Sequence, residues 1–476
     1  MSTAVKIAKN TTSIVIANIT TKLIAIFIVI YLARYLGVEE FGKYNFVTTY
    51  FSFFMVLTTF GLDPVVIKEV AKNKSLTNKI INNVIIIRIL TSFVSILFSI
   101  IVVIMLNYSE EMVFYVMLAS CTMTFQSLSY VYESLFQAYL KMQYYAVSMI
   151  LYKLIFAVFI FLIIFMNGNL FDMILALILS EFLRTLIDFS YSKKFVKYKN
   201  FGFDINFKFW ETIIKQAIPF ILSAAFFIVY YRIDVLMLSS MKGDVSVGLY
   251  SAAYKLTDPL LFLPSAVSST LMPVMAKQYV GEKNTLRRTY IMSMRYIFVL
   301  MAPITMGICI LSKKIVLLLY GTEYFGSATA LQLLSCSLLF NSLNSIQSSM
   351  LISVDKQKVN SLVVGIGCIV NVVLNLVLIP KYDYIGAAFA TLLSVIAVFT
   401  SGYYSVSKLI SVPKRLLFSK PALATSLMGM IILKLIEYNI VYLVIVGAFV
   451  YFSLMTILKG FNEEDINLFK KIINRS

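Results

Sequence analysis

Ionisable side chains lie inside long apolar stretches of this 476-residue chain, and they are the residues most able to do chemistry. A charged side chain at the centre of a bilayer costs roughly 3 kcal/mol, so such residues usually face a cavity or a charged partner. A cavity lined by an excess of cations would attract an anionic group such as a phosphate or pyrophosphate. The candidates are five cations and two acids: Lys22, Arg88, Lys153, Arg232, Lys255, Asp234 and Asp258.

The depth of each residue within its apolar stretch indicates its role. Lys22 and Lys255 lie near the middle of their stretches, too deep for the ammonium groups to reach water easily, so we expect them to line a cavity. Arg88 and Lys153 lie nearer one end, where lining a cavity and reaching back to the membrane surface are equally open. Asp258 follows Lys255 by three residues, a spacing that places both on one face of a helix.

Two further groups of charges have a different spacing. Arg232 and Asp234 are two residues apart, so they point in different directions, and we expect them near the outer surface with separate partners. Glu181, Arg184 and Asp188 share one helix face, because they follow i, i+3, i+7 spacing. Two acids around one arginine are typical of a structural charge network.

The sequence lacks the residues that common enzyme classes need. It contains no histidine, which removes histidine-based catalysis, metal ligation and proton relays. It has no G-x-x-x-x-G-K-[ST] phosphate-binding loop and no D-x-D motif, and its four cysteines are scattered. The net charge of +18 comes mainly from loops between apolar stretches, which is a membrane-protein pattern. We therefore expect no catalytic residues, no metal site, no cofactor and no nucleic-acid partner.

Composition and periodicity predict an all-α integral membrane protein. Hydrophobic residues make up 60% of the chain and charged residues only 13%, too few to cover a soluble core of this size. Apolar stretches of about 18 residues or more recur along the whole length, as in proteins with many membrane-spanning helices. We predict fourteen spans: 11–36, 44–63, 81–106, 112–136, 146–166, 171–192, 212–238, 246–274, 289–311, 324–352, 359–380, 384–408, 417–436 and 439–458.

Loop charges predict the orientation of these spans. With the N-terminus inside, Lys and Arg concentrate in the cytoplasmic loop of every loop pair, so both termini should be cytoplasmic in a multi-pass protein of the cell membrane. The longest polar stretch, 193–208, would be a cytoplasmic linker. We expect an N-terminal lobe of six spans over 1–195, a linker over 196–211 and a C-terminal lobe of six spans over 212–410. Two more spans and a cytoplasmic tail would occupy 411–476.

An internal repeat supports the division into lobes. The stretch Phe41–Tyr44 (FGKY) aligns with Val247–Tyr250 (VGLY) when the chain is laid against itself. Each copy begins an even-numbered span, has proline within or near its end and leads into a basic loop. Because six spans is an even number, both lobes would keep the same orientation, as in transporters built from parallel repeats.

Four stretches of the chain resemble one family. LARYLGVEEFGKYNF (32–46), RIDVLMLSSMKGDVSVGLYSAAYKL (232–256), YGTEYFGSATALQLLS (320–335) and NVVLNLVLIPKYDYIGAAFATLLS (371–394) are similar to the polysaccharide transporters, or Wzx-type flippases. This family shares a superfamily with lipid II flippases and multidrug extruders. The resemblance runs over essentially the whole chain.

The resemblance implies a fold, a mechanism and a set of site residues. It implies two six-helix lobes around a central cavity, with two further C-terminal helices that help form a groove for a lipid tail. Alternating access would carry an isoprenoid-pyrophosphate-linked oligosaccharide from the cytoplasmic to the outer leaflet for surface polysaccharide synthesis. Cations of the lobes would bind the head group. The matching stretches contribute Arg34, Arg232, Asp234 and Lys255 to this substrate-binding set.

Two other functions stay open. A cation-coupled drug or small-molecule antiporter of the same fold would favour acidic residues in its cavity, whereas cations are in excess here. A membrane glycan polymerase or transferase would need a large external loop, and the predicted loops are short. The energy source is also open: membrane potential alone could drive transport, or a carboxylate could bind H⁺ or Na⁺, with candidates Asp63, Glu133, Glu181, Asp234 and Asp258. We expect a monomer among membrane lipids, with possible association with glycan polymerase machinery.

Overall fold

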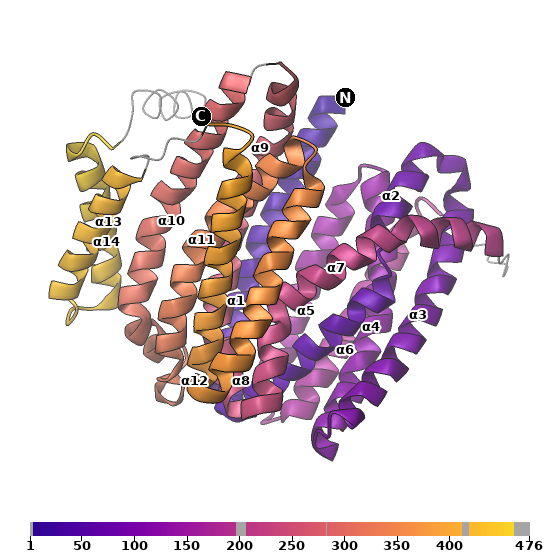
Figure 1. Ribbon diagram of the computed structural model, residues 1–476. Helices are drawn as coiled ribbons and strands as arrows, with labels where there is room; N and C mark the ends of the chain where they lie inside the picture. Colours follow the sequence, from indigo (N-terminus) through magenta and orange to yellow (C-terminus); the bar gives the residue numbers. More distant parts are fainter. Residues whose placement is uncertain (1–2, 197–205, 282, 412–417, 461–476) are drawn as a thin grey trace. The chain divides into compact units, whose positions relative to one another are not determined.

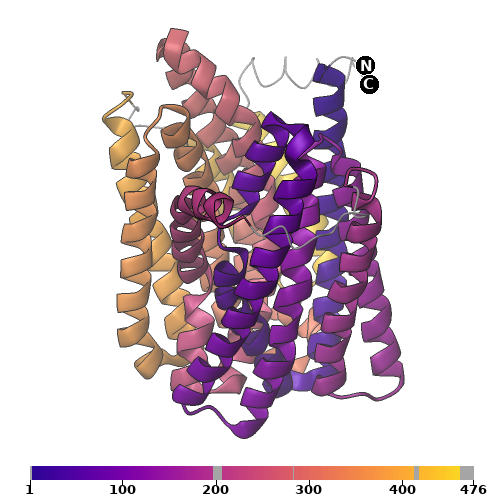
Figure 2. The ribbon, with the colours of Figure 1, turned by 90° about the vertical axis from the view of Figure 1, so that its right-hand side faces the viewer.

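The computed structural model describes residues 3–196, 206–281, 283–411 and 418–460, and these ranges fold into helices joined by short turns (Figures 1 and 2). The α-helices are α1 (Thr3–Thr59), α2 (Asp63–Lys72), α3 (Thr77–Met105), α4 (Glu110–Ala138), α5 (Met142–Phe165), α6 (Leu170–Ser192), α7 (Phe207–Lys242), α8 (Asp244–Thr257), α9 (Phe262–Gly281), α10 (Lys283–Leu319), α11 (Ser327–Ser353), α12 (Gln357–Ser407), α13 (Ser419–Lys434) and α14 (Ile440–Ile457).

Thirteen of the fourteen predicted spans each overlap mainly one helical segment of the described chain, and span 8 covers two helices and the turn between them. Spans 1 and 2 are the two parts of α1, which breaks at Gly37, and spans 11 and 12 are the two parts of α12, which breaks at Asp383. By length and apolar composition alone, nine helical stretches within the described ranges can cross a membrane. The protein is therefore an all-α, multi-pass membrane protein, as the sequence predicts.

Equivalent glycines of the predicted repeat share an unusual backbone geometry. Gly37 has φ 72° and ψ 177°, and Gly243, at the equivalent position of the second copy, has φ 82° and ψ −172°. Both φ values lie in the left-handed region, which glycine adopts without the steric cost that other residues meet. The two copies therefore enter their even-numbered spans through the same kind of break.

The two copies also contact each other, and the contact is reciprocal. A β-carbon at Gly42 would lie 1.9 Å from the carbonyl oxygen of Asp244, and one at Gly248 would lie 2.1 Å from the carbonyl oxygen of Val38. Val38 and Asp244 are themselves equivalent positions of the repeat, as are the two glycines. Small residues at such crossings let helices in a membrane approach closely.

Predicted span 8 is broken in the structure. The helix α8 ends at Thr257, a 3₁₀-helical turn covers Asp258–Leu261, and α9 begins at Phe262. The second residue of the turn is Pro259, which has no N–H to donate and whose ring disfavours a continuing α-helix. Lys255 and Asp258 therefore lie on either side of a change in helix type, not on one continuous α-helical face as their spacing predicts.

The chain packs as two compact units that divide between Gly248 and Leu249. The helix α7 packs along α1 and α2, so it belongs to the first unit although it follows the predicted linker. Most of that linker, 197–205, lies outside the described residues, as does the predicted cytoplasmic tail from 461 onward. In the second unit, α13 and α14 form a hairpin that packs against α10 (Figure 1).

Candidate functional site

Three carboxylates of the first unit meet around Arg184. The guanidinium group of Arg184 donates to the carboxylate of Glu133 on α4 and, at 3.2 Å, to that of Glu181 on its own helix, α6. Its Nε lies 3.9 Å from a carboxylate oxygen of Asp188. None of the four side chains is more than 13% exposed. The spacing on α6 predicts three members, and Glu133 joins them because α4 packs along α6.

Lys153 of α5 lies beside this cluster. Its ammonium group is 4.8 Å from the centre of the Tyr152 ring, and the guanidinium carbon of Arg184 is 5.2 Å from the centre of the same ring. The charge of Lys153 also interacts with that of Glu181. None of the ion pairs formed within the described ranges includes Lys153. Cation–π contacts therefore hold this ammonium group and leave its charge available to an anion.

Arg88 forms an ion pair where the chain turns between α1 and α2. Phe60 and Gly61 have φ values of 47° and 60°, which end α1. The guanidinium of Arg88 donates to Asp63 at 2.5 Å and to the carbonyl of Thr58 at 3.4 Å. Arg88 is fully buried and the side chain of Asp63 is 32% exposed. In this conformation Arg88 stabilises the turn between the two helices.

The other predicted site residues divide between the two units. Most are partly buried, while Asp234 is 3% exposed and Arg34 is exposed. Those of the first unit are Lys22, Arg34, Arg232 and Asp234, and those of the second unit are Lys255 and Asp258. The structure thus gathers Lys153 with the Arg184 cluster and pairs Arg88 with Asp63, while the remaining candidates lie on α1, α7, α8 and the turn after α8.

Charges also surround Gly42, at the start of the second part of α1. The ammonium group of Lys43 lies 2.8 Å from Glu40 and 3.1 Å from Glu111 of α4. Burial alone would lower the pKa of Lys43, but its hydrogen bonds to the two carboxylates outweigh this and raise the pKa above its ordinary value. Lys43 therefore stays charged at neutral pH and ties α1 to α4 beside the glycine contact.

An apolar cavity of about 760 Å³ lies between α10, α13 and α14 in the second unit. Its lining runs along α10 from Arg295 to Ile315, a length of roughly 30 Å at 1.5 Å per residue, which matches the hydrocarbon thickness of a bilayer. Small residues leave room for it: a β-carbon at Gly307 would meet nothing within 4 Å. We call this cavity the α10–α14 groove.

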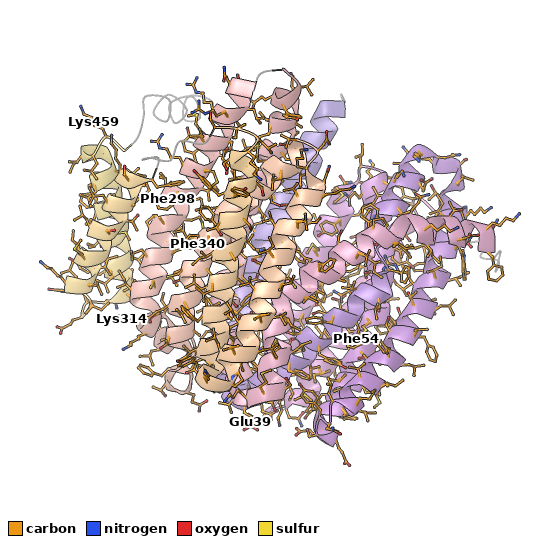
Figure 3. The ribbon with its side chains drawn as sticks, in the orientation of Figure 1. Glu39, Phe54, Phe298, Lys314, Phe340 and Lys459 are labelled. Carbon is orange, nitrogen blue, oxygen red and sulfur yellow. The ribbon has the colours of Figure 1, made fainter. Side chains whose placement is uncertain are left out.

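Cations lie at both ends of the helices that form the groove (Figure 3). Lys314 donates at 2.5 Å to the carbonyl of Tyr438, in the turn that joins α13 to α14. At the opposite end, Lys459 follows α14, and Arg295 donates at 2.5 Å to the carbonyl of Gly460. Arg295 is 7% exposed and is the charged residue of the groove lining. Arg295 is not among the residues predicted from the sequence. It lies inside predicted span 9, and a position inside a span is the signal that selected the other buried cations.

The polysaccharide biosynthesis protein family matches residues 7–279, which is more than half of the chain. The chain belongs to this family. A second family description, MatE, matches residues 219–377. Both agree with the resemblance that the four sequence stretches indicate.

Curated relatives include proteins of glycan biosynthesis. The capsular polysaccharide biosynthesis protein CapF of Staphylococcus aureus is 24% identical over 400 residues, which cover 83% of this chain and 98% of CapF. The probable low-salt glycan biosynthesis flippase Agl15 of Haloferax volcanii is 25% identical over 166 residues, 35% of each chain. The chain spans 51% of an uncharacterized membrane protein of Methanocaldococcus jannaschii.

The fold resembles that of a solved flippase. The lipid II flippase MurJ, in an inward closed conformation, superposes with a TM-score of 0.78 at 17% identity, over 93% of this chain and 97% of MurJ. An inward-facing multidrug transporter of the MATE family has a TM-score of 0.66 at 15% identity, over 83% of this chain and 96% of that one. The MurJ and MATE transporters therefore share the fold of this protein.

Proposed function

We propose that this protein is a flippase that moves an isoprenoid-pyrophosphate-linked oligosaccharide from the cytoplasmic to the outer leaflet for surface polysaccharide synthesis. The family and the names of CapF and Agl15 support a role in glycan export. The observation that carries the proposal is the α10–α14 groove, because an isoprenoid chain needs an apolar channel of membrane length. A small water-soluble drug has no long hydrocarbon tail that such a channel could hold.

The groove has the size and chemistry to hold a long hydrocarbon tail. Its volume of about 760 Å³ falls within the usual range of ligand sites, and its walls are aliphatic and aromatic side chains of three helices. Burying apolar ligand surface there is favourable by roughly 25 cal/mol per Å². Cations would bind the head group, and Lys153 of the first unit is the best-supported of these because it forms none of the described ion pairs.

The other charged residues predicted from the sequence would also contact the substrate. Lys22 and Lys255 would line the substrate cavity, because both are partly buried at mid-span depth. The family resemblance supports substrate contacts by Arg34, Arg232 and Asp234. The position of Asp258 inside a span supports the same role for that residue. Arg88 would contact substrate only in a conformation that separates it from Asp63.

The distribution of Lys and Arg among the loops supports a membrane topology for the protein. Both termini would be cytoplasmic in a cell-membrane protein, with α13 and α14 added to two six-span lobes.

The protein would transport its substrate without changing it chemically. Incubating the purified protein with lipid-linked repeat units should leave their length unchanged, whereas longer glycan chains would support a polymerase or transferase.

Filling the groove tests the proposed function. Gly307→Leu places a side chain where a β-carbon meets open space, so the helix should stay intact while the groove narrows. We expect surface glycan export to fall at least tenfold in a strain that depends on this protein, at equal protein abundance. Gly365→Leu is the matched control, because Gly365 is equally unobstructed but lies on α12 outside the groove. Equal export by both variants would contradict a role for the groove.

A drug antiporter is the second candidate, because the MatE description matches part of the chain. It predicts resistance to cationic drugs in cells that produce the protein. The flippase proposal predicts no change in resistance and complementation of a strain that lacks glycan export.

A further inference from the structure

The cluster around Arg184 contains more acid than base. Its carboxylates are Glu133, Glu181 and Asp188, and its cations are Arg184 and the neighbouring Lys153, so its formal charge is −1. The side chains of Glu181 and Asp188 are 2% and 0% exposed. A net charge buried inside a membrane protein costs several kcal/mol unless it is neutralised.

Neutral side chains and one ion pair surround the cluster. Tyr130 of α4 and Tyr145 and Tyr152 of α5 interact with its charges, Tyr44 of α1 interacts with Tyr152, and all four are neutral in their ordinary form. Asp63 also acts on Tyr130, but it pairs with Arg88, so this pair adds no net charge. The formal charge stays −1 when these groups are included.

Asp188 has the weakest contact with Arg184 of the three carboxylates. Its nearer oxygen lies 3.9 Å from the guanidinium Nε of Arg184, and that Nε has no hydrogen-bond partner. The hydroxyls of Ser148 on α5 and Ser129 on α4 lie beside Asp188 and are the donors available to it. Two hydroxyls replace water only in part around a fully buried carboxylate, whereas a protonated carboxyl gains an O–H that can donate to such a hydroxyl.

We propose that Glu133, Lys153, Glu181, Arg184 and Asp188 together hold one dissociable proton. The proton belongs to the three carboxyl groups as a set, since their titrations are coupled at these distances. A metal ion does not fit, because the positively charged guanidinium of Arg184 occupies the centre of the carboxylates. Within the described residues, no group of three acidic or sulfur ligands has the geometry to hold a metal ion.

Lys153 links this proton to the substrate, a step that rests on the proposed function. When a pyrophosphate binds Lys153, it cancels one of the two cations that face the carboxylates, and the proton affinity of the cluster rises. Linkage requires the reverse effect of equal size: a proton on the cluster strengthens pyrophosphate binding. With one linked proton, affinity should increase by up to about tenfold for each unit of falling pH in the alkaline range where the free cluster has lost its proton, and should level off once the cluster is protonated.

Counting protonated carboxyl groups tests the proton site without any substrate. The full-length protein in lipid nanodiscs at pH 7 is measured by infrared spectroscopy, in which protonated carboxyls absorb apart from carboxylates. Asp188→Asn balances the cluster, so it should lose one protonated carboxyl relative to the wild-type protein. Lys153→Met should gain one, and the double variant should match the wild-type protein.

Further variants guard against misfolding and misassignment. If Asp188→Asn does not fold, Glu133→Gln should give the same loss, because the count depends on charge and not on which carboxyl holds the proton. Asp172→Asn, at the exposed start of α6, should change nothing. An unchanged count in Asp188→Asn and Lys153→Met overturns the proposal, as does a count that changes when sodium replaces choline in the buffer.

The link to the substrate has its own measurement. Binding of an isoprenyl pyrophosphate to the nanodisc protein should tighten as the pH falls through the alkaline range in which the wild-type cluster takes up its proton, and over the same range it should not depend on pH in Asp188→Asn. If the carboxyl counts hold but no variant binds the pyrophosphate, the proton site stands and the proposed function fails. If binding is strong and equally independent of pH in both proteins, the link fails and the flippase proposal stands.

Discussion

Replacing Gly42 with alanine tests whether the reciprocal glycine contact acts as a gate. The added methyl carbon would lie 1.9 Å from the carbonyl oxygen of Asp244, where ordinary contact begins at 3.4 Å, so the two segments must separate by about 1.5 Å. Overpacking of this kind costs about 1–3 kcal/mol. If the contact exists only in a state closed at this end, that energy shifts the equilibrium toward the open state by about 5- to 150-fold.

The shift can be followed through the accessibility of a cysteine at Asn45, one turn after Gly42 and 2% exposed. In a background with the four native cysteines replaced by alanine, Asn45→Cys should react slowly with a membrane-impermeant maleimide. Adding Gly42→Ala should accelerate labelling at least fivefold. Gly365→Ala is the matched control, since its β-carbon meets nothing within 4 Å. Equal labelling rates in Gly42→Ala and in the control would refute the gate.

Two further substitutions test the ion pairs of the first unit. Asp63→Asn leaves the fully buried Arg88 without its carboxylate, so we expect a loss of about 3 kcal/mol of stability and a clearly lower Tm in nanodiscs; an unchanged Tm would show that the pair is not needed. Lys43→Gln removes ion pairs with Glu40 and Glu111, whose side chains are 36% and 51% exposed, so the loss should stay below about 1 kcal/mol per pair. A larger loss would mean that this end of α1 is more deeply desolvated than its exposure indicates.

The spans could be predicted from the sequence because apolar stretches of membrane length leave few alternatives. Even the break inside α1 is signalled, since Gly37 separates two stretches that are each long enough to span. The interruption at Asp258 was harder to foresee. Three prolines, Pro259, Pro264 and Pro273, follow in that region, and only the first ends the α-helix.

The candidate site was only partly predictable, because helix packing decides which charges meet. Spacing on α6 groups Glu181, Arg184 and Asp188, but nothing in the sequence states that Glu133 of α4 faces them. Similarly, Arg88 was predicted from its depth alone, whereas its partner Asp63 is the last residue of predicted span 44–63 and begins the separate helix α2. Contacts between helices depend on tertiary structure, which periodicity does not reveal.

The most direct test of the flippase proposal is to reconstitute the purified protein in liposomes that carry a fluorescent isoprenoid-pyrophosphate-linked oligosaccharide. A membrane-impermeant quencher then reports how much of the lipid reaches the outer leaflet. The proposal predicts rapid movement in liposomes with the wild-type protein and slow movement with Gly307→Leu or with no protein. Equal rates in the wild-type and protein-free liposomes, at a pH and membrane potential that favour transport, would contradict it.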